Sequence, residues 1–450
     1  MNPIPDSFNR LSISTKPMQI NRQLKRWRKR GIRSLVAVLL LGGVVSCGDN
    51  PTSEGATQSI TILGSITGDG ADAIEQVFAP FTESTGIEVI YEGTDAFATI
   101  LPVRVEGGNP PDLALFPQPG LMRDLAENEQ LVALDSFLSV EQFTAAYDET
   151  WLDLGRVNGQ LYGLWARADL KSLVWYRPDR FEEEGYAVPE SWDELMALSE
   201  QIIADGGVPW CIGMESGAAT GWVGTDWVED ILLRQAGVAV YDQWVNHEIP
   251  FTHPAVKEAF EAFGAIARNP EMVLGGAVGV ISTPFGDAPQ PLFNDPPGCY
   301  LHRQTNFIST FFPESVTVGE DVDIFLLPSM AQAETPPILV GGTAFAMLSD
   351  RPEVRSAVEY LLTPDPHEIW VGLENYVSPH QQVDPEAYAD DLTRTQAEIL
   401  AEATTIRFDG SDLMPGAVGT GTFWSGMVDY VGGADIDVVL EAIEESWPEE

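Results

Sequence analysis

From residue 59 onward, segments with the apolar and polar spacing of strands alternate with segments that have the spacing of helices. SITILGSI (59–66) alternates and predicts a strand. The next apolar residues recur at i, i+3, i+4 and i+7, which predicts a helix ending at Gly86; they are Ile74, Val77, Phe78 and Phe81. EVIYEG (88–93) and DLALFP (112–117) predict two more strands, with a helix between them that begins near Asp95 and is broken around Pro102. Strands that alternate with helices predict parallel βαβ units and an α/β fold.

The rest of the chain continues this mixture. LYGLWARADLKSLVWYRPDRF (161–181) predicts two extended pieces around a polar centre. Ser191 and Glu194 have the spacing of a capping box at a helix start. A helical section follows that contains GWVGTDWVEDILLRQ (221–235). Strands are predicted at 321–330 and 338–350, then a helix at 352–362 and a surface amphipathic helix at 435–447. We find no internal repeat.

The N-terminal part has a different pattern. A basic run (25–33) precedes 12 residues without a charge (34–45). This apolar run is too short for a membrane-spanning helix, which needs roughly 20 residues, and basic-then-apolar order is typical of a secretory signal. A short buried helix is the alternative, but the basic residues flank only one side.

The residues Val44, Val45, Ser46 and Cys47 resemble the lipobox of bacterial lipoproteins. This resemblance implies that residues 1–46 are removed and that Cys47 carries a lipid anchor. Residues 47–58 are polar and predict a flexible tether. Met18 is an alternative start to Met1. The expected location is the periplasm, at the outer face of the cytoplasmic membrane.

The composition is strongly acidic. Residues 1–46 hold 9 of the 24 Lys and Arg and 1 of the 68 Asp and Glu, which leaves 15 basic against 67 acidic residues and a net charge of about −52. Such a charge argues against binding to nucleic acid or to an anionic membrane surface, because both need a basic face. Cys211 and Cys299 are the cysteines that remain after Cys47. In an oxidising compartment they predict a disulfide; two buried free thiols are the alternative.

Motifs in a particular order resemble extracellular solute-binding proteins of ATP-binding-cassette importers, in particular the sugar-binding family. They are Gly108-Asn109-Pro110-Pro111-Asp112, Asp124-Leu125, Leu131-Val132, Leu134-Asp135, Tyr162-Gly163, Val174-Trp175-Tyr176, Val188-Pro189 with Ser191-Trp192-Asp193-Glu194-Leu195, and Gly341-Gly342-Thr343-Ala344. DLMPGAVGTGTFWSGM (412–427) is similar to the corresponding stretch of members that bind α-glucosides. The resemblance runs from about residue 59 to the end of the chain.

This resemblance implies an α/β, two-lobed periplasmic-binding-protein fold of type II, like that of maltose-binding protein, with the ligand between the lobes. Lobe 1 would comprise residues 59–167 plus 326–374, and lobe 2 residues 168–325 plus 375–450. Crossing strands would lie near 167–171, near 323–327 and near Tyr376. The implied function is to capture an α-glucoside or related glycoside and deliver it to the permease subunits in the membrane, as a monomer without a cofactor.

A sugar site needs aromatic rings for the sugar faces and polar side chains for the hydroxyls. Candidate ligand-binding residues are Asp95, Phe116, Gln118, Lys171, Glu215, Trp222, Asp226, Arg303, Gly342, Thr343, Asp412 and Trp424. Alternatives stay open for several of them: a core position for Phe116, a surface position for Gln118 and a helix cap for Asp95. Arg303 and Gln304 fit a buried structural ion pair equally well. Trp222 and Asp226 would share a helix face, or Asp226 would mark the helix entry.

Enzymatic motifs do not occur in the sequence. None of the five histidines belongs to H-E-x-x-H, and G-x-S-x-G, a P-loop and a G-x-G-x-x-G at a helix start are missing. We therefore predict a binding protein with no catalytic residues and no metal site. A sensor that delivers its ligand to a membrane receptor is the alternative function. A glycoside hydrolase is a further one, because carboxylate pairs can arise anywhere in so acidic a chain.

Overall fold

A computed structural model describes residues 58–330 and 336–448. The predicted signal segment, Cys47 and all but the last residue of the predicted tether lie outside the described residues. Within the described ranges, none of the helices has the length and apolarity needed to cross a membrane.

The larger sheet contains six strands and confirms the predicted α/β class. Its strand order is β11-β10-β3-β1-β2, with β6 paired to β10 as well. β1 is parallel to β2 and β3, and β10 is parallel to β11 but antiparallel to β3 and β6. The strands are β1 (Ser59–Gly64), β2 (Glu88–Gly93), β3 (Leu113–Phe116), β6 (Leu164–Leu170), β10 (Ile338–Met347) and β11 (Ile406–Phe408).

The first predicted helix is confirmed as α1, and its four apolar residues are all buried. It ends at Gly86, whose φ of 74° is in the left-handed region that favours glycine. The predicted break around Pro102 is wrong, because α2 runs through this residue as a helix. The helices accompanying this sheet in sequence are α1 (Asp69–Thr85), α2 (Phe97–Glu106), α3 (Pro119–Glu127), α4 (Val140–Ala146), α5 (Glu149–Leu154), α12 (Pro352–Leu361), α13 (Pro364–Leu373) and α14 (Asp391–Glu402).

A second sheet has the order β8-β7-β9 and is antiparallel throughout. Its strands are β7 (Leu173–Tyr176), β8 (Leu301–Arg303) and β9 (Asp323–Leu326). A short hairpin joins β4 (Arg156–Val157) and β5 (Gln160–Leu161). The remaining helices are α6 (Pro178–Glu184), α7 (Trp192–Ala204), α8 (Trp222–Ala236), α9 (Val238–Val245), α10 (Pro254–Ala267), α11 (Gly276–Ser282), α15 (Gly410–Leu413), α16 (Trp424–Val431) and α17 (Ile436–Glu444).

Two large apolar cores support these sheets. One surrounds the six-stranded sheet and includes Ile62, Phe78 and Leu115. The other lies mainly among helices, with Trp227 of α8 and Phe260 of α10 fully buried in it. The predicted Cys211–Cys299 disulfide is present, with a Cα–Cα separation of 5.6 Å. The predicted start of α7 is also confirmed, since Ser191 Oγ accepts the Glu194 backbone N–H at 3.3 Å.

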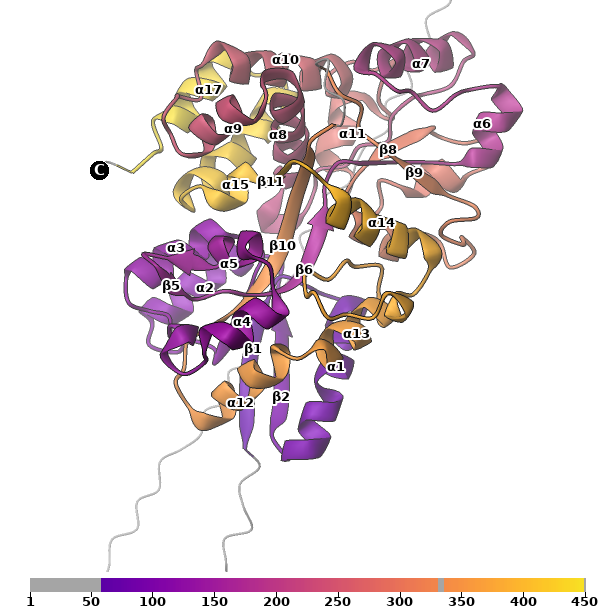
Figure 1. The fold of residues 1–450 in the computed structure, drawn as a ribbon. Coiled ribbons are helices and arrows are strands. Elements are labelled where there is room, and N and C mark those ends of the chain that lie inside the picture. The colour runs from indigo at the N-terminus through magenta and orange to yellow at the C-terminus, as the bar shows by residue number, and fades with distance from the viewer. Residues whose placement is uncertain (1–57, 331–335, 449–450) are drawn as a thin grey trace, which may run out of the picture. The chain divides into compact units, whose positions relative to one another are not determined.

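Strands β6 and β10 run side by side, and every residue of both is buried (Figure 1). Burial on both faces explains why β10 reads as a continuous apolar run. β6 leads directly through Lys171 and Ser172 into β7 of the second sheet. Ala168 of β6 also forms a bridge with Val377. The predicted lobe boundaries remain predictions, but the chain passes between the two sheets at the first predicted crossing.

Candidate ligand-binding site

Strand β6 carries three charged residues at alternating positions: Arg167, Asp169 and, just beyond its end, Lys171. Because side chains along a strand point alternately to opposite faces, these three share one face. All three are at most 8% exposed. Burying charged side chains is costly unless they are paired, so their partners define the candidate site.

Lys171 lies in a cluster of carboxylates. Its ammonium donates to Asp226 Oδ1 at 3.0 Å and to Asp409 Oδ2, and lies 3.8 Å from Asp412 Oδ2. Asp226 comes from α8, whereas Asp409 caps α15 by accepting the Asp412 backbone N–H at 2.8 Å. In the same cluster, Glu229 accepts the backbone N–H of Gly410 at 2.6 Å. The lysine therefore ties the end of β6 to α8 and to the start of α15.

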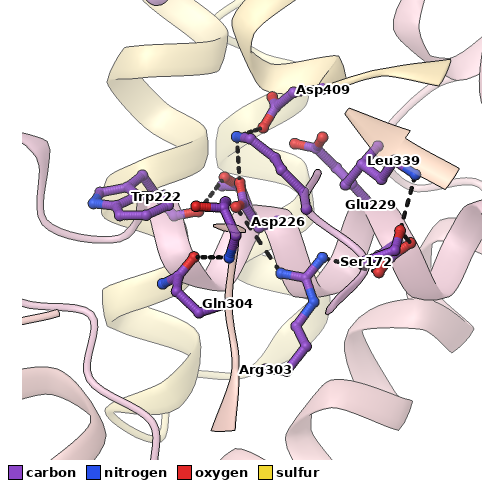
Figure 2. A network of polar contacts seen from close by, with 12 residues as sticks. Ser172, Trp222, Asp226, Glu229, Arg303, Gln304, Leu339 and Asp409 are labelled. Atoms are coloured by element: carbon purple, nitrogen blue, oxygen red, sulfur yellow. Dashed lines mark hydrogen bonds and ion pairs between the residues drawn. The ribbon is translucent and has the colours of Figure 1, made fainter. Parts of the chain in front are cut away.

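A second carboxylate network continues from this cluster along α8. Asp230 accepts Arg303 Nη2 at 2.9 Å and Ser172 Oγ at 2.9 Å, and it also accepts Arg234 Nη1. Figure 2 shows Arg303 directed toward these carboxylates, and Ser172 bonded to the Leu339 backbone N–H (2.9 Å). Arg303, Asp230 and Arg234 are all at most 2% exposed. The network joins α8, β8, the β6–β7 turn and β10.

Burial and neighbouring charges shift the pKa values of the carboxylates around Lys171 in opposite directions. Desolvation raises the pKa of Asp226 to about 8, although Lys171 opposes the shift. Desolvation is also the largest single influence on Asp409, but the Lys171 ammonium and the hydrogen bonds from Asp226, Lys171 and the Asp412 backbone together lower the pKa of Asp409 to about 2. The pKa values of Glu229 and Asp412 are raised by burial and by Asp409. The negative charge that faces Lys171 at neutral pH therefore sits mainly on Asp409.

Four aromatic rings form a wall beside the charged face of β6: Trp222, Phe285, Phe307 and Tyr376. Neighbouring ring centroids in this aromatic wall are 5.3 to 6.4 Å apart. Lys171 Nζ lies 5.7 Å from the Trp222 ring, and the Arg167 guanidinium lies 4.1 Å from the Tyr376 ring. Trp222, Phe285 and Phe307 are each partly exposed. The wall offers ring faces of the kind that pack on the C–H faces of a sugar.

Several predicted residues come together near this wall. Trp222 and Asp226 lie one turn apart on α8, as predicted for a shared helix face. The carbonyl of Trp424 would lie 2.1 Å from a Cβ placed on Gly221, so the first turns of α16 and α8 meet. Trp424 is only 6% exposed, and its indole N–H has no partner within the described ranges.

Two further pairs of predicted residues lie on segments that approach each other closely at a glycine. Gly217 lies so close to Asp95 that a Cβ atom added to this glycine would be 2.1 Å from Asp95 Oδ2. The Gly217 backbone N–H also donates to Glu215 Oε1 at 2.9 Å. A Cβ on Gly120 would lie 3.0 Å from the Asp412 carbonyl, and Gln118 directly precedes the same helix α3. Segments from distant parts of the sequence therefore meet at Asp95 with Glu215, and at Gln118 with Asp412.

Other predicted residues have structural positions instead. Phe116 is fully buried and packs edge-on against Phe97, with ring centroids 5.4 Å apart, which is the position of the core alternative. Arg303 likewise belongs to the buried ion-pair network, as its alternative stated. Burial of a hydrophobic side chain and of a paired charged side chain accounts for these two positions.

The glycine pair predicted to present backbone amides to the ligand lies inside β10. Gly342 and Thr343 pair with Ala168 and Arg167 of β6, so their backbone belongs to the sheet. A Cβ on Gly342 would lie 2.5 Å from the Arg167 carbonyl, and one on Gly341 would lie 2.5 Å from Lys171 Cε. The two glycines therefore allow the close approach of strand and side chain.

Sequence reasoning missed Arg167, Asp169, Phe307 and Tyr376 as candidates. The pattern R-A-D-L-K places charges on one face of an otherwise apolar strand, and that alternation is the signal that could have identified the first two. Phe307 and Tyr376 carry no comparable local signal, because their role depends on which strands meet.

A separate cavity of about 960 Å³ shares none of the predicted residues. It is lined mainly by α5, α9, α14, β11 and the segment 377–383. Its Arg407 is paired with Asp242 through two bonds of 2.6 and 2.9 Å. None of the cavity's lining side chains has a buried polar atom lacking a partner among the described residues. Several such atoms lie on β6, including two on Arg167 and one on Asp169, so we place the candidate site there.

Comparisons with known proteins show to which family this chain belongs. The family model for bacterial extracellular solute-binding proteins matches residues 67–368. The "Osmoprotective compounds-binding protein GgtB" of Synechocystis sp. is 55% identical over 93% of this chain and 99% of its own. The "Alpha-glucosides-binding periplasmic protein AglE" of Rhizobium meliloti is 44% identical over 87% of each chain.

Among solved structures, "Maltose bound T. maritima MalE3" superposes with a TM-score of 0.69 at 16% identity, covering 86% of this chain and 98% of that one. This likeness shows the fold alone, which is the predicted two-lobed α/β fold of sugar-binding proteins. The matched family consists of binding proteins rather than enzymes. On these grounds, the chain belongs to the bacterial extracellular solute-binding protein family.

Proposed function

We propose that this protein is the substrate-binding component of an ABC importer and that it captures an uncharged glycoside of the α-glucoside class. The two relatives above support the proposal by their printed functions, one for osmoprotective compounds and one for α-glucosides. Their high coverage means that the whole chain, not one segment, corresponds to these binding proteins.

The observation that carries the proposal is the combination of the aromatic wall with buried polar atoms of both kinds. Among the described residues, Gln118 Oε1 is an acceptor without a hydrogen-bond partner, and donors without one include Gln304 Nε2 and Trp424 Nε1. A hydroxyl group both donates and accepts, so a polyhydroxyl ligand can satisfy both kinds. A ligand with only acceptors, or only a positive charge, would leave one kind unpaired and costly to bury.

In the proposed cycle, Cys47 anchors the secreted protein through its lipid, and the tether lets the folded part reach the permease. Two or more acyl chains give stable anchoring, at about 0.8 kcal/mol per buried methylene. The ligand would bind between the lobes and favour their closed arrangement by its higher affinity for that state. The closed protein then acts as a monomer that delivers the glycoside.

Isothermal titration calorimetry of the mature protein tests this function. The panel comprises maltose, trehalose, sucrose and glucosylglycerol, with glycine betaine as a charged osmolyte for comparison. We expect saturable heat with at least one of the glycosides and none with betaine. Binding of betaine alone, or of no carbohydrate, would overturn the proposal. Hydrolysis of a bound glycoside during the titration would favour the hydrolase instead.

A further inference from the structure

The two cations on the charged face of β6 differ in how completely they are paired. Lys171 donates two hydrogen bonds to carboxylates of the cluster. Arg167 has a single hydrogen bond to a carboxylate, from Nη2 to Asp169 Oδ2, and at 3.4 Å it is long. Arg167 Nε lies 3.4 Å from Asp169 Oδ1, an ion-pair contact without hydrogen-bond geometry. Among the described residues, Arg167 Nε, Arg167 Nη1 and Asp169 Oδ1 have no partner that meets hydrogen-bond geometry.

These unpaired atoms are deeply buried. Arg167 and Asp169 are 8% and 5% exposed, so water reaches them poorly. Burying an unpaired polar atom costs about 1 to 3 kcal/mol, and more for a charged group. Burial opposes the charge of Arg167, but Asp169 raises its pKa, so the guanidinium stays protonated. The pair therefore offers permanent donors and one acceptor that the rest of the fold leaves unused.

The aromatic wall fixes the orientation of the guanidinium. Its central carbon lies 4.1 Å from the Tyr376 ring centroid and 5.3 Å from that of Phe307. A guanidinium can also stack its plane on an aromatic ring, which a lysine ammonium cannot do because it has no plane to align. A side chain held in this way loses little conformational freedom when a ligand binds.

The charges around Arg167 indicate an uncharged ligand group. Asp169 lies beside the guanidinium, and the Glu374 carboxylate also acts on it electrostatically. The positive charge is thus already balanced, so a ligand carboxylate or phosphate would meet acidic neighbours. A hydroxyl accepts from Nη1 and donates to Asp169 Oδ1 without adding charge.

We propose that Arg167, oriented by Tyr376 and Phe307 and paired with Asp169, contacts ligand hydroxyls directly and determines which glycosides bind, whereas Lys171 is structural. This inference rests on the proposed function. Hydrogen bonds to a charged group contribute about 1.5 to 3 kcal/mol, so loss of Arg167 lowers affinity about 10- to 100-fold.

The test measures affinities by calorimetry for the wild type, R167M and R167K. The ligand is whichever of maltose, trehalose, sucrose and glucosylglycerol binds the wild type most tightly, together with its monodeoxy analogues. We expect R167M to weaken binding about 10- to 100-fold and R167K to weaken it nearly as much. Removing the hydroxyl that faces Arg167 should weaken wild-type binding but should not weaken binding to R167M further.

R394M is the matched control, because Arg394 is an arginine of α14 that pairs with Asp391 and lines the separate cavity. It should bind like the wild type. D169N keeps the shape of Asp169 and provides a second variant if R167M does not fold; it should weaken binding while leaving sensitivity to the other hydroxyls intact. Equal affinity of the wild type, R167M and D169N would overturn this inference alone. Failure of the wild type to bind all four glycosides would overturn the proposed function and this inference together.

Discussion

Replacing Asp230 by alanine tests the buried network most severely. This carboxylate accepts hydrogen bonds from Arg303, Arg234 and Ser172, and both guanidinium groups are fully buried. Removing one member of a buried ion pair costs about 3 to 5 kcal/mol, because the other charge is left without a partner. Here one carboxylate serves two guanidinium groups, so we expect the D230A protein to lose about 4 to 5 kcal/mol.

Such a loss is a large share of the 5 to 15 kcal/mol by which domains are typically stable. Urea unfolding followed by tryptophan fluorescence measures it as a shift of the midpoint at unchanged slope. The matched control is D179A on α6, whose carboxylate pairs with Arg177 at 2.6 Å but is 55% exposed. Exposed pairs contribute about 0 to 1 kcal/mol. If the free energy of unfolding of D230A were within about 1 kcal/mol of that of the D179A control, the reasoning that this network is dry and structurally required would be refuted.

Three further predictions follow from buried groups. F116A should lower stability by about 3 to 5 kcal/mol without changing ligand affinity. F311A, which removes a ring that is 40% exposed, should lower stability little. If folded F116A bound the ligand more weakly, the assignment of Phe116 to the core would be contradicted. C211S/C299S should lower stability by about 4 to 5 kcal/mol, because the disulfide closes a separation of 88 residues; an unchanged urea midpoint would show that the bridge does not constrain the unfolded chain. Burial lowers the pKa of His302 to about 4 and that of His367 to about 3, so the unfolded chain binds protons first and stability should fall as pH drops below about 6.5. For His302 the shift is worth up to about 3 kcal/mol near pH 4, and H302Q should show a shallower decline between pH 7 and 5 than the wild type; parallel curves would argue against it.

Local patterns predicted much of the first βαβ unit. The strand at β1, the apolar face of α1 and its end at Gly86 all depend on contacts within about one helix length, so spacing alone identifies them. Pro102 misled the prediction: a proline inside a helix removes one backbone hydrogen bond, yet α2 continues through it to Glu106.

The candidate site was only partly predictable, since it depends on which distant segments meet. Trp222 and Asp226 share a helix, and their spacing revealed them. Phe307 and Tyr376 join one wall only through the fold, and Phe116 lies in the core because β3 is buried on both faces. The glycine pair at Gly341 and Gly342 was recognised as important, but its reason is the crowding of β6 against β10, which no single segment discloses.

A crystal structure of the mature protein with the tightest-binding glycoside of the panel is the most direct test of the account. We predict electron density for the sugar against the aromatic wall, with a hydroxyl within hydrogen-bond distance of Arg167 or Asp169. Density in the cavity lined by α5 and α14 instead, with the charged face of β6 untouched, would contradict the central claim.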